Sequence, residues 1–217
     1  MINEIEAAIF DMDGTLIDSM GIWCKLDHAY LNKRNISIPK DLKKNIEHLS
    51  FINTAKYFKK TFNLSESVED IVDEWNEMAF CEYANNIKLK ENVDKYLKYL
   101  VKNNIKIGLA TSNNPLLTEA VLKKNKIYDY FQCIATTDEV GKPKNCPDIY
   151  LLAAKRLNVD PSKCLVFEDI LAGVMGAKKA GMKVIGVYDD YSLDDHIEMT
   201  KNADLFITEY KELLDAI

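Results

Sequence analysis

Short apolar runs alternate with helical patterns along most of this chain. The runs predict strands at residues 7–10, 105–110, 133–135, 164–167, 183–187 and 205–207. Between them, apolar side chains recur at helical spacing, as at Val93, Leu97 and Leu100. Strands that alternate with helices are typical of a parallel sheet covered by helices on both faces. The pattern therefore predicts an α/β fold.

Residues 16–87 break this alternation. Apolar spacing there predicts consecutive amphipathic helices at about residues 22–31, 52–62 and 66–81, with little strand signal. We therefore predict an α/β core formed by residues 1–15 and 88–217. An all-helical domain of residues 16–87 is inserted just after the first strand.

Composition narrows the class of protein. The chain has 217 residues, of which 47% are hydrophobic, so it can bury one core and carry an insertion. Its 28 basic residues are interspersed with 34 acidic ones, which argues against nucleic-acid binding. No apolar run approaches membrane-spanning length, and the N-terminus lacks a signal-peptide pattern. The five cysteines are scattered without a C-x-x-C pair, which indicates free thiols in a reducing compartment. We expect a cytoplasmic monomer that binds no membrane.

Acidic and hydroxyl side chains follow the ends of three predicted strands. They are Asp11 and Asp13, then Thr111 and Ser112, then Glu168 and Asp169. The chemistry of an open parallel sheet gathers beyond the carboxyl ends of its strands, so these residues are expected to converge. Carboxylates are ligands for Mg²⁺, while hydroxyls and a nearby lysine bind phosphoryl oxygens. The pattern predicts a magnesium and phosphate site.

Four segments, in chain order, resemble the motifs of the haloacid dehalogenase superfamily of phosphotransferases. Asp11-Met12-Asp13-Gly14-Thr15 resembles its first motif, and Thr111-Ser112-Asn113 its second. The run from Lys144 to Tyr150 is similar to its lysine motif. Phe167-Glu168-Asp169, with Gly173 downstream, resembles the fourth motif of the subfamily that contains β-phosphoglucomutase and related phosphatases. The resemblance implies a Rossmann-like core with a helical cap.

The resemblance also implies a role for each matching residue. Asp11 would attack phosphorus and carry an aspartyl-phosphate, and Asp13 would act as general acid and base. Thr111 would bind the transferring phosphoryl group, with Ser112 and Asn113 as further substrate-binding residues. The implied Mg²⁺ ligands are Asp11, Asp13 (through its backbone carbonyl), Glu168 and Asp169.

Two lysines compete for the role of the lysine motif. The string Gly141-Lys142-Pro143 favours Lys142, whereas the spacing to Pro147-Asp148 favours Lys144. We expect Lys144 to be the catalytic residue, because the helix that follows fixes its distance from the site. The choice between the two stays open at this point.

The reaction expected from the resemblance is hydrolysis of a small phosphorylated metabolite, of the sugar phosphate or nucleotide class. An aspartate at position 13 favours an oxygen ester, whose leaving group needs a proton. The alternative is a sugar phosphomutase of the β-phosphoglucomutase type. That enzyme uses a cap histidine where this chain has Trp23, and the expected cap offers only Arg34 as an arginine. We therefore favour a phosphatase, with Trp23 lining the substrate pocket.

Overall fold

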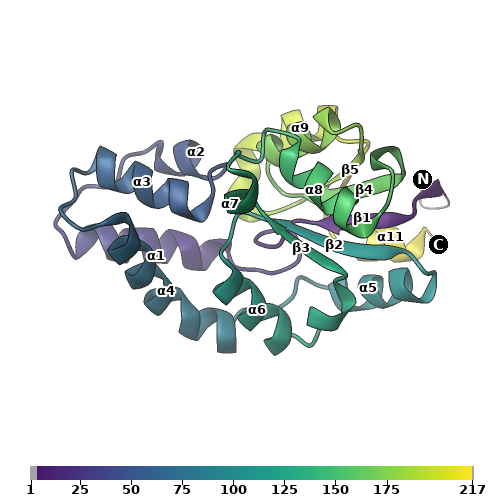
Figure 1. The fold of residues 1–217 in the computed structure, drawn as a ribbon, viewed down its shortest axis with the longest axis horizontal. Coiled ribbons are helices and arrows are strands. Elements are labelled where there is room, and N and C mark those ends of the chain that lie inside the picture. The colour runs from purple at the N-terminus through teal and green to yellow at the C-terminus, as the bar shows by residue number, and fades with distance from the viewer. Residues whose placement is uncertain (1–3, 217) are drawn as a thin grey trace.

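A single six-stranded parallel sheet forms the centre of the computed structural model, which describes residues 4–216 (Figure 1). Residues 1–3 and 217, which the predicted core includes, lie outside the described residues. The strand order is β3-β2-β1-β4-β5-β6, the Rossmann order, so the predicted α/β class is confirmed. The strands are β1 (Ala7–Phe10), β2 (Lys106–Thr111), β3 (Cys133–Thr136), β4 (Cys164–Glu168), β5 (Lys183–Val187) and β6 (Leu205–Ile207).

Helices cover both faces of this sheet (Figure 1). Side chains alternate along each strand, so Phe10 and Phe167 pack into one face and Ile9 and Val166 into the other. On the first face lie α5 (Val93–Lys102), α6 (Pro115–Lys124) and α11 (Lys211–Asp215). On the second lie α8 (Asp148–Leu157), α9 (Leu171–Lys179) and α10 (His196–Asn202). The remaining core elements are α7 (Thr137–Val140) and the 3₁₀ turns η2 (Tyr128–Tyr130), η3 (Pro161–Lys163) and η4 (Asp190–Asp195).

Four helices between β1 and α5 extend away from the sheet at one end of the molecule (Figure 1). They are α1 (Met20–Asn32), α2 (Leu42–Ile46), α3 (Phe51–Thr61) and α4 (Val68–Asn85). We call them the helical insertion. Three were predicted; α2 was not, because its five residues are too few to show a periodic apolar pattern. Helix α4 begins at a capping box between Ser67 and Asp70 and runs four residues beyond the predicted end.

The two connections to the insertion lie side by side. Asp18 N donates to Lys88 O at 3.0 Å, and Lys90 N donates to Leu16 O at 2.9 Å. An isolated antiparallel bridge joins Ile17 to Leu89 between these bonds. The backbone therefore fixes where the insertion leaves the core and where it returns.

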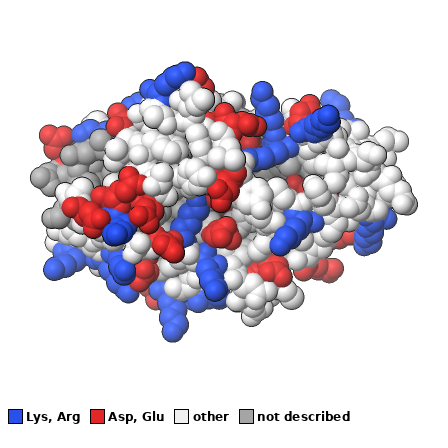
Figure 2. Space-filling model, turned by 180° about the vertical axis from the view of Figure 1, so that it is seen from behind, with Lys and Arg blue, Asp and Glu red and all other residues white. Residues whose placement is uncertain are grey.

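Charged side chains of both signs are interspersed over the face of the molecule seen in Figure 2. Within residues 4–216, none of the helices combines the length and apolar character needed to cross a bilayer.

The insertion is held by a cluster of buried aromatic rings. The ring centroid of Phe58 lies 4.9 Å from that of Trp75, 5.2 Å from that of Phe62 and 6.0 Å from that of Tyr30. We predict that Phe58→Ala lowers the free energy of unfolding by about 3–5 kcal/mol, because it removes a fully buried ring and leaves a cavity. Chemical denaturation measures this loss.

Phe80→Ala is the matched control, since Phe80 lies on α4 and is 41% exposed. Its cost is expected to stay within about 0.5 kcal/mol. Equal losses in the two variants would show that the aromatic cluster does not stabilise the insertion.

Candidate active site

Three buried carboxylates meet at the carboxyl ends of β1 and β4. Asp11 follows β1, Glu168 is the last residue of β4, and Asp169 comes next in the chain. One oxygen from each lies within 4.8 Å of the other two. The two strands pair directly, Phe10 opposite Phe167, so their ends lie side by side. Parallel pairing therefore places these acids together, although Asp11 and Glu168 are far apart in sequence.

Lys144 is the cation of this cluster. Its buried Nζ forms an ion pair with Asp11 and lies 2.7 Å from Glu168 Oε1. Burial disfavours an ammonium, but the carboxylates of Asp11 and Glu168 outweigh it and raise the pKa of Lys144. Lys142, by contrast, is exposed to solvent. Of the two candidate lysines, the structure brings Lys144 to the acids.

One lysine does not satisfy all three carboxylates. Burial raises the pKa of Glu168 to about 7, and burial with the nearby charge of Asp11 raises that of Asp169 well above its usual value. Glu168 Oε2 and Asp169 Oδ2 are buried and accept no hydrogen bond from the described residues. Carboxylate oxygens without a partner, at this spacing, are the donor set that a hard cation such as Mg²⁺ prefers, and a bound cation would favour their ionised form. The residues present fit a metal ion.

Close approach to this cluster depends on glycines. A Cβ at Gly173 of α9 would lie 2.2 Å from Glu168 Oε2, and one at Gly176 would lie 1.9 Å from the backbone oxygen of Lys144. The simplest interpretation of Gly173 from the sequence is packing between helix and strand. The structure shows that its missing side chain makes room for the Glu168 carboxylate.

Asp13 has different surroundings from the other three acids. Ser19 Oγ donates to Asp13 Oδ1 at 2.6 Å, as does Trp23 Nε1 at 3.4 Å, and Asn113 Nδ2 donates to Oδ2 at 3.0 Å. Tyr83 Oη is a further donor to Oδ1. Burial raises the pKa of Asp13, and the hydrogen bonds from Ser19 and Tyr83 offset part of that rise. The Asp13 side chain is thus held apart from the cluster that Lys144 joins.

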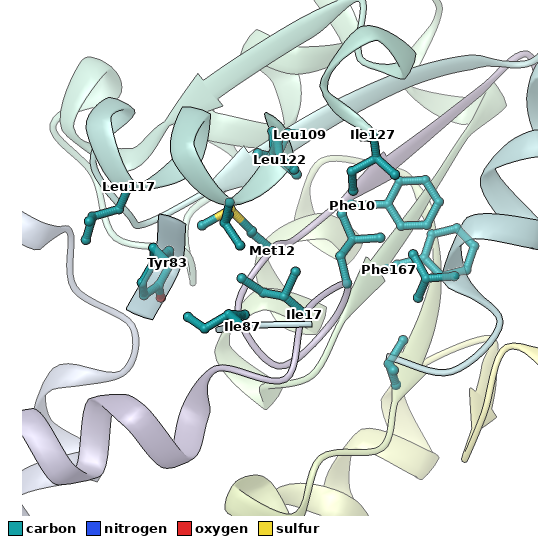
Figure 3. Packing of buried hydrophobic residues seen from close by; sticks show 14 of the residues in the cluster. Phe10, Met12, Ile17, Tyr83, Ile87, Leu109, Leu117, Leu122, Ile127 and Phe167 are labelled. Carbon is teal, nitrogen blue, oxygen red and sulfur yellow. The ribbon is translucent and has the colours of Figure 1, made fainter. Parts of the chain in front are cut away.

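Tyr83 is the site residue that sequence reasoning missed. It lies on α4 beyond the predicted end of that helix, in the buried apolar cluster that also contains Met12 (Figure 3). Its hydroxyl also accepts from Trp23 Nε1 at 2.6 Å and from Asn113 Nδ2 at 3.1 Å. A tyrosine on the apolar side of a helix is usually interpreted as a core residue. The sequence pattern therefore did not predict the contact of Tyr83 with Asp13.

Two further residues near the acids differ from their simplest sequence interpretation. Ser19 occupies the N-cap position of α1, as its sequence suggests, but its hydroxyl binds Asp13 and does not cap the helix. Tyr150 of α8 was not singled out by the sequence, yet its hydroxyl donates to Glu168 Oε1 at 2.8 Å.

The segment after β2 faces both the core and the insertion. Thr111 Oγ1 accepts from the backbone N–H of Asn113 at 3.0 Å. Ser112 Oγ is buried and has no hydrogen-bond partner among residues 4–216. Phe51 N of the insertion donates to Ser112 O at 3.1 Å, and Lys144 N donates to His48 O at 3.1 Å. His48 in the loop before α3 and Phe51 at the start of α3 therefore contact both segments that carry predicted site residues.

A cavity of about 170 Å³ separates the insertion from these segments. Its lining includes Asp13, Ser112 and Asn113 from the core side and Trp23 and Phe51 from the insertion. A larger cavity of about 410 Å³ lies beside the two connections and is lined by none of the predicted site residues. The smaller cavity, which reaches Asp13, is therefore the candidate substrate pocket.

Comparisons with known proteins agree with this geometry. The model of the haloacid dehalogenase-like hydrolase family matches residues 8–187. The phosphorylated carbohydrates phosphatase of Thermotoga maritima is 28% identical over 214 residues, 98% of each chain. (DL)-Glycerol-3-phosphatase 2 of Arabidopsis thaliana is 30% identical over 193 residues, 85% of this chain and 80% of the relative. The crystal structure of β-phosphoglucomutase from Clostridium difficile has a TM-score of 0.81 and 26% identity, covering 96% of this chain and 93% of that one.

The ion pairs of Lys144 make a prediction about stability. Lys144→Met should lower the free energy of unfolding by about 3–5 kcal/mol in metal-free buffer at pH 8, because Asp11 and Glu168 remain buried without their cation. Chemical denaturation measures the change.

Lys142→Met, two residues away and exposed, should change that free energy by no more than about 0.5 kcal/mol. If both variants unfolded at the same denaturant concentration as the wild type, Lys144 would not be needed to hold the carboxylates together.

Proposed function

The chain belongs to the haloacid dehalogenase-like hydrolase family, and we propose that it is a Mg²⁺-dependent phosphatase of small phosphate monoesters. The observation that carries this proposal is the division of the four acids. Asp11 lies with Lys144 and two metal-suited carboxylates, whereas Asp13 lies at the substrate cavity. Phosphoryl transfer through an enzyme carboxylate requires a nucleophile that lies beside positive charge, here Asp11. It also requires a separate acid for the leaving group, here Asp13.

The orphaned oxygens of Glu168 and Asp169 support the metal assignment. Asp11, Asp169 and Glu168 would hold Mg²⁺ through carboxylate oxygens, and Asp13 through its backbone carbonyl. When bound, the ion neutralises charge on the phosphoryl oxygens. Lys144 contributes a second positive charge at Asp11, so the dianionic phosphate is not repelled by the acids.

The reaction proceeds in two displacements. Asp11 attacks phosphorus, the bond from phosphorus to the ester oxygen breaks, and Asp13 gives its proton to the leaving alkoxide. In the second step a water molecule attacks the aspartyl-phosphate and Asp13 takes its proton. Inorganic phosphate leaves and Asp11 is again a free carboxylate. Thr111, Ser112 and Asn113 bind the phosphoryl group, and the buried Ser112 hydroxyl supports this role because it has no hydrogen-bond partner among residues 4–216.

The structure favours hydrolysis over mutase chemistry. Trp23 stands where the mutase has a histidine, and its indole N–H is already bonded to Tyr83 and Asp13. Arg34 stacks on the Tyr30 ring at 3.7 Å, pairs with Glu66 and Glu74, and does not line the cavity. Neither side chain is available to hold a second phosphate. Two relatives of this chain are also named phosphatases.

We assign residues 16–87 the role of a cap that closes over the phosphate-binding end. The contacts from Phe51 to Ser112 and from Lys144 to His48 support this role. We also propose a cytoplasmic location, which the five free cysteines support.

Turnover of p-nitrophenyl phosphate tests the proposed function. We predict release of p-nitrophenol that requires Mg²⁺ and stops on chelation, because Glu168 and Asp169 leave oxygens without a protein partner. Asp11→Asn removes the nucleophile and is expected to lower kcat by orders of magnitude. Full activity in excess chelator would refute the metal assignment, and full activity of Asp11→Asn would refute the nucleophile.

Tyr83 gives a second test, specific to this chain. We expect Tyr83→Phe to lower kcat by about 10–10²-fold, because Asp13 loses a donor that fixes its orientation. The loss is expected to be larger for alkyl phosphates than for p-nitrophenyl phosphate, whose leaving group needs little protonation. KM is expected to change less than kcat.

Tyr30→Phe is the matched control, since the Tyr30 hydroxyl is buried without a partner among the described residues. It should leave turnover unchanged. If Tyr83→Phe affected both kinds of leaving group equally, Tyr83 would not act through Asp13.

A further inference from the structure

The substrate cavity contains an acidic side chain that the proposed chemistry does not use. Asp27 of α1 lines the cavity together with Asp13, Trp23 and Phe51. It lies four residues after Trp23, so it is on the same side of the helix and about 6 Å farther along its axis. Trp23 contacts Asp13. Asp27 therefore faces the part of the cavity beyond the reacting bond.

This carboxylate has no partner in the part of the chain that the structure describes. Neither a hydrogen bond nor an ion pair involves its oxygens, and burial raises the pKa of Asp27 to about 7. A half-buried, unpaired carboxylate is costly unless something donates to it. Because Asp27 lines the cavity, a bound ligand is the partner that can reach it.

Besides Asp13 and Asp27, the charged side chains that line the cavity are Lys43 of α2 and Glu47, the residue that follows α2. Lys43 Nζ lies 4.0 Å from Glu47 Oε2, so its charge is largely offset by its own neighbour. Asp27 is then the group whose charge is not offset, and it is negative above a pH of about 7, where the carboxyl is ionised. Trp23, Phe51 and Trp75 supply apolar side chains to the lining of the same cavity.

We propose that Asp27 is a specificity-determining residue that selects phosphate monoesters carrying hydroxyl or ammonium donors on the part remote from the phosphate. A hydroxyl or ammonium group of the substrate can donate a hydrogen bond to the Asp27 carboxylate. A second anionic group at the same place would be repelled by it. The proposal rests on the phosphatase function proposed above and narrows its substrates to polyol, sugar or amino-sugar monophosphates. It excludes bisphosphates and phosphorylated carboxylic acids.

Three six-carbon compounds that carry the same phosphate test this selection. They are glucose 6-phosphate, glucosamine 6-phosphate and 6-phosphogluconate, each used as a competitor of p-nitrophenyl phosphate hydrolysis by the wild type. We expect 6-phosphogluconate to inhibit at least about tenfold more weakly than the better of the other two, because like charges placed together are costly. The ratio between glucose 6-phosphate and glucosamine 6-phosphate shows whether a hydroxyl or an ammonium is the preferred donor.

Asp27→Asn removes the charge and keeps the shape. It should bring the inhibition constant of 6-phosphogluconate to within about threefold of the others. Asp73→Asn is the matched control, since Asp73 is an exposed residue of the same insertion. It should keep the wild-type ratios.

The outcomes separate the two proposals. If the wild type does not hydrolyse p-nitrophenyl phosphate, the phosphatase function is wrong. If it does, but the three competitors bind equally, none of them competes, or Asp27→Asn keeps the wild-type ratios, only the role of Asp27 is wrong. Should Asp27→Asn fail to fold, the wild-type ratios alone still decide, because equal binding contradicts selection by charge.

Discussion

The buried imbalance of charge at the ends of β1 and β4 is the constraint on which the rest of the site depends. Asp11, Glu168 and Asp169 gather there around the ammonium of Lys144. Burying a charge is costly unless it is paired, and one lysine pairs two of the three. By itself this arrangement is unfavourable. A bound cation and a phosphate group would supply the missing partners and so explain why the protein keeps it.

The surrounding residues are arranged to permit this imbalance. Tyr150 donates to Glu168, and the Thr15 hydroxyl lies within hydrogen-bond distance of both Asp169 and Asp11. Gly173 and Gly176 let α9 pass so close that a single methyl group would collide with Glu168 or with the Lys144 backbone. These glycines hold no chemistry themselves. They let α9 pack directly against the Glu168 carboxylate and the backbone of Lys144.

The sequence predicted the core better than it predicted the insertion, for a physical reason. Strand ends in a parallel sheet converge whatever the intervening sequence, so the positions of Asp11 and Glu168 follow from the pattern of apolar runs. The spacing from Lys144 to the next helix likewise indicated which of the two lysines lies beside the acids. The contacts of Tyr83 with Asp13, Trp23 and Asn113 depend on how α4 packs against the core, and a helical pattern does not specify its partners. Asp27 was missed for a similar reason. A charged residue on a helix is predicted to face solvent, and only the structure shows the cavity beside it.

Asp13 shows how the two parts of the fold depend on each other. Asp11 and Asp13 are two residues apart, yet Asp11 pairs with a lysine of the core, whereas Asp13 accepts from Tyr83 and Trp23 of the insertion. Different surroundings let neighbouring carboxylates take the different roles that we propose for them, Asp11 as nucleophile and Asp13 as acid. The same helix α1 that supplies Trp23 to Asp13 presents Asp27 one turn later. A movement of α1 that changed the fit to a substrate would therefore also move a donor of the catalytic acid. In the proposed mechanism, the choice of substrate and the placement of the proton therefore depend on the same helix.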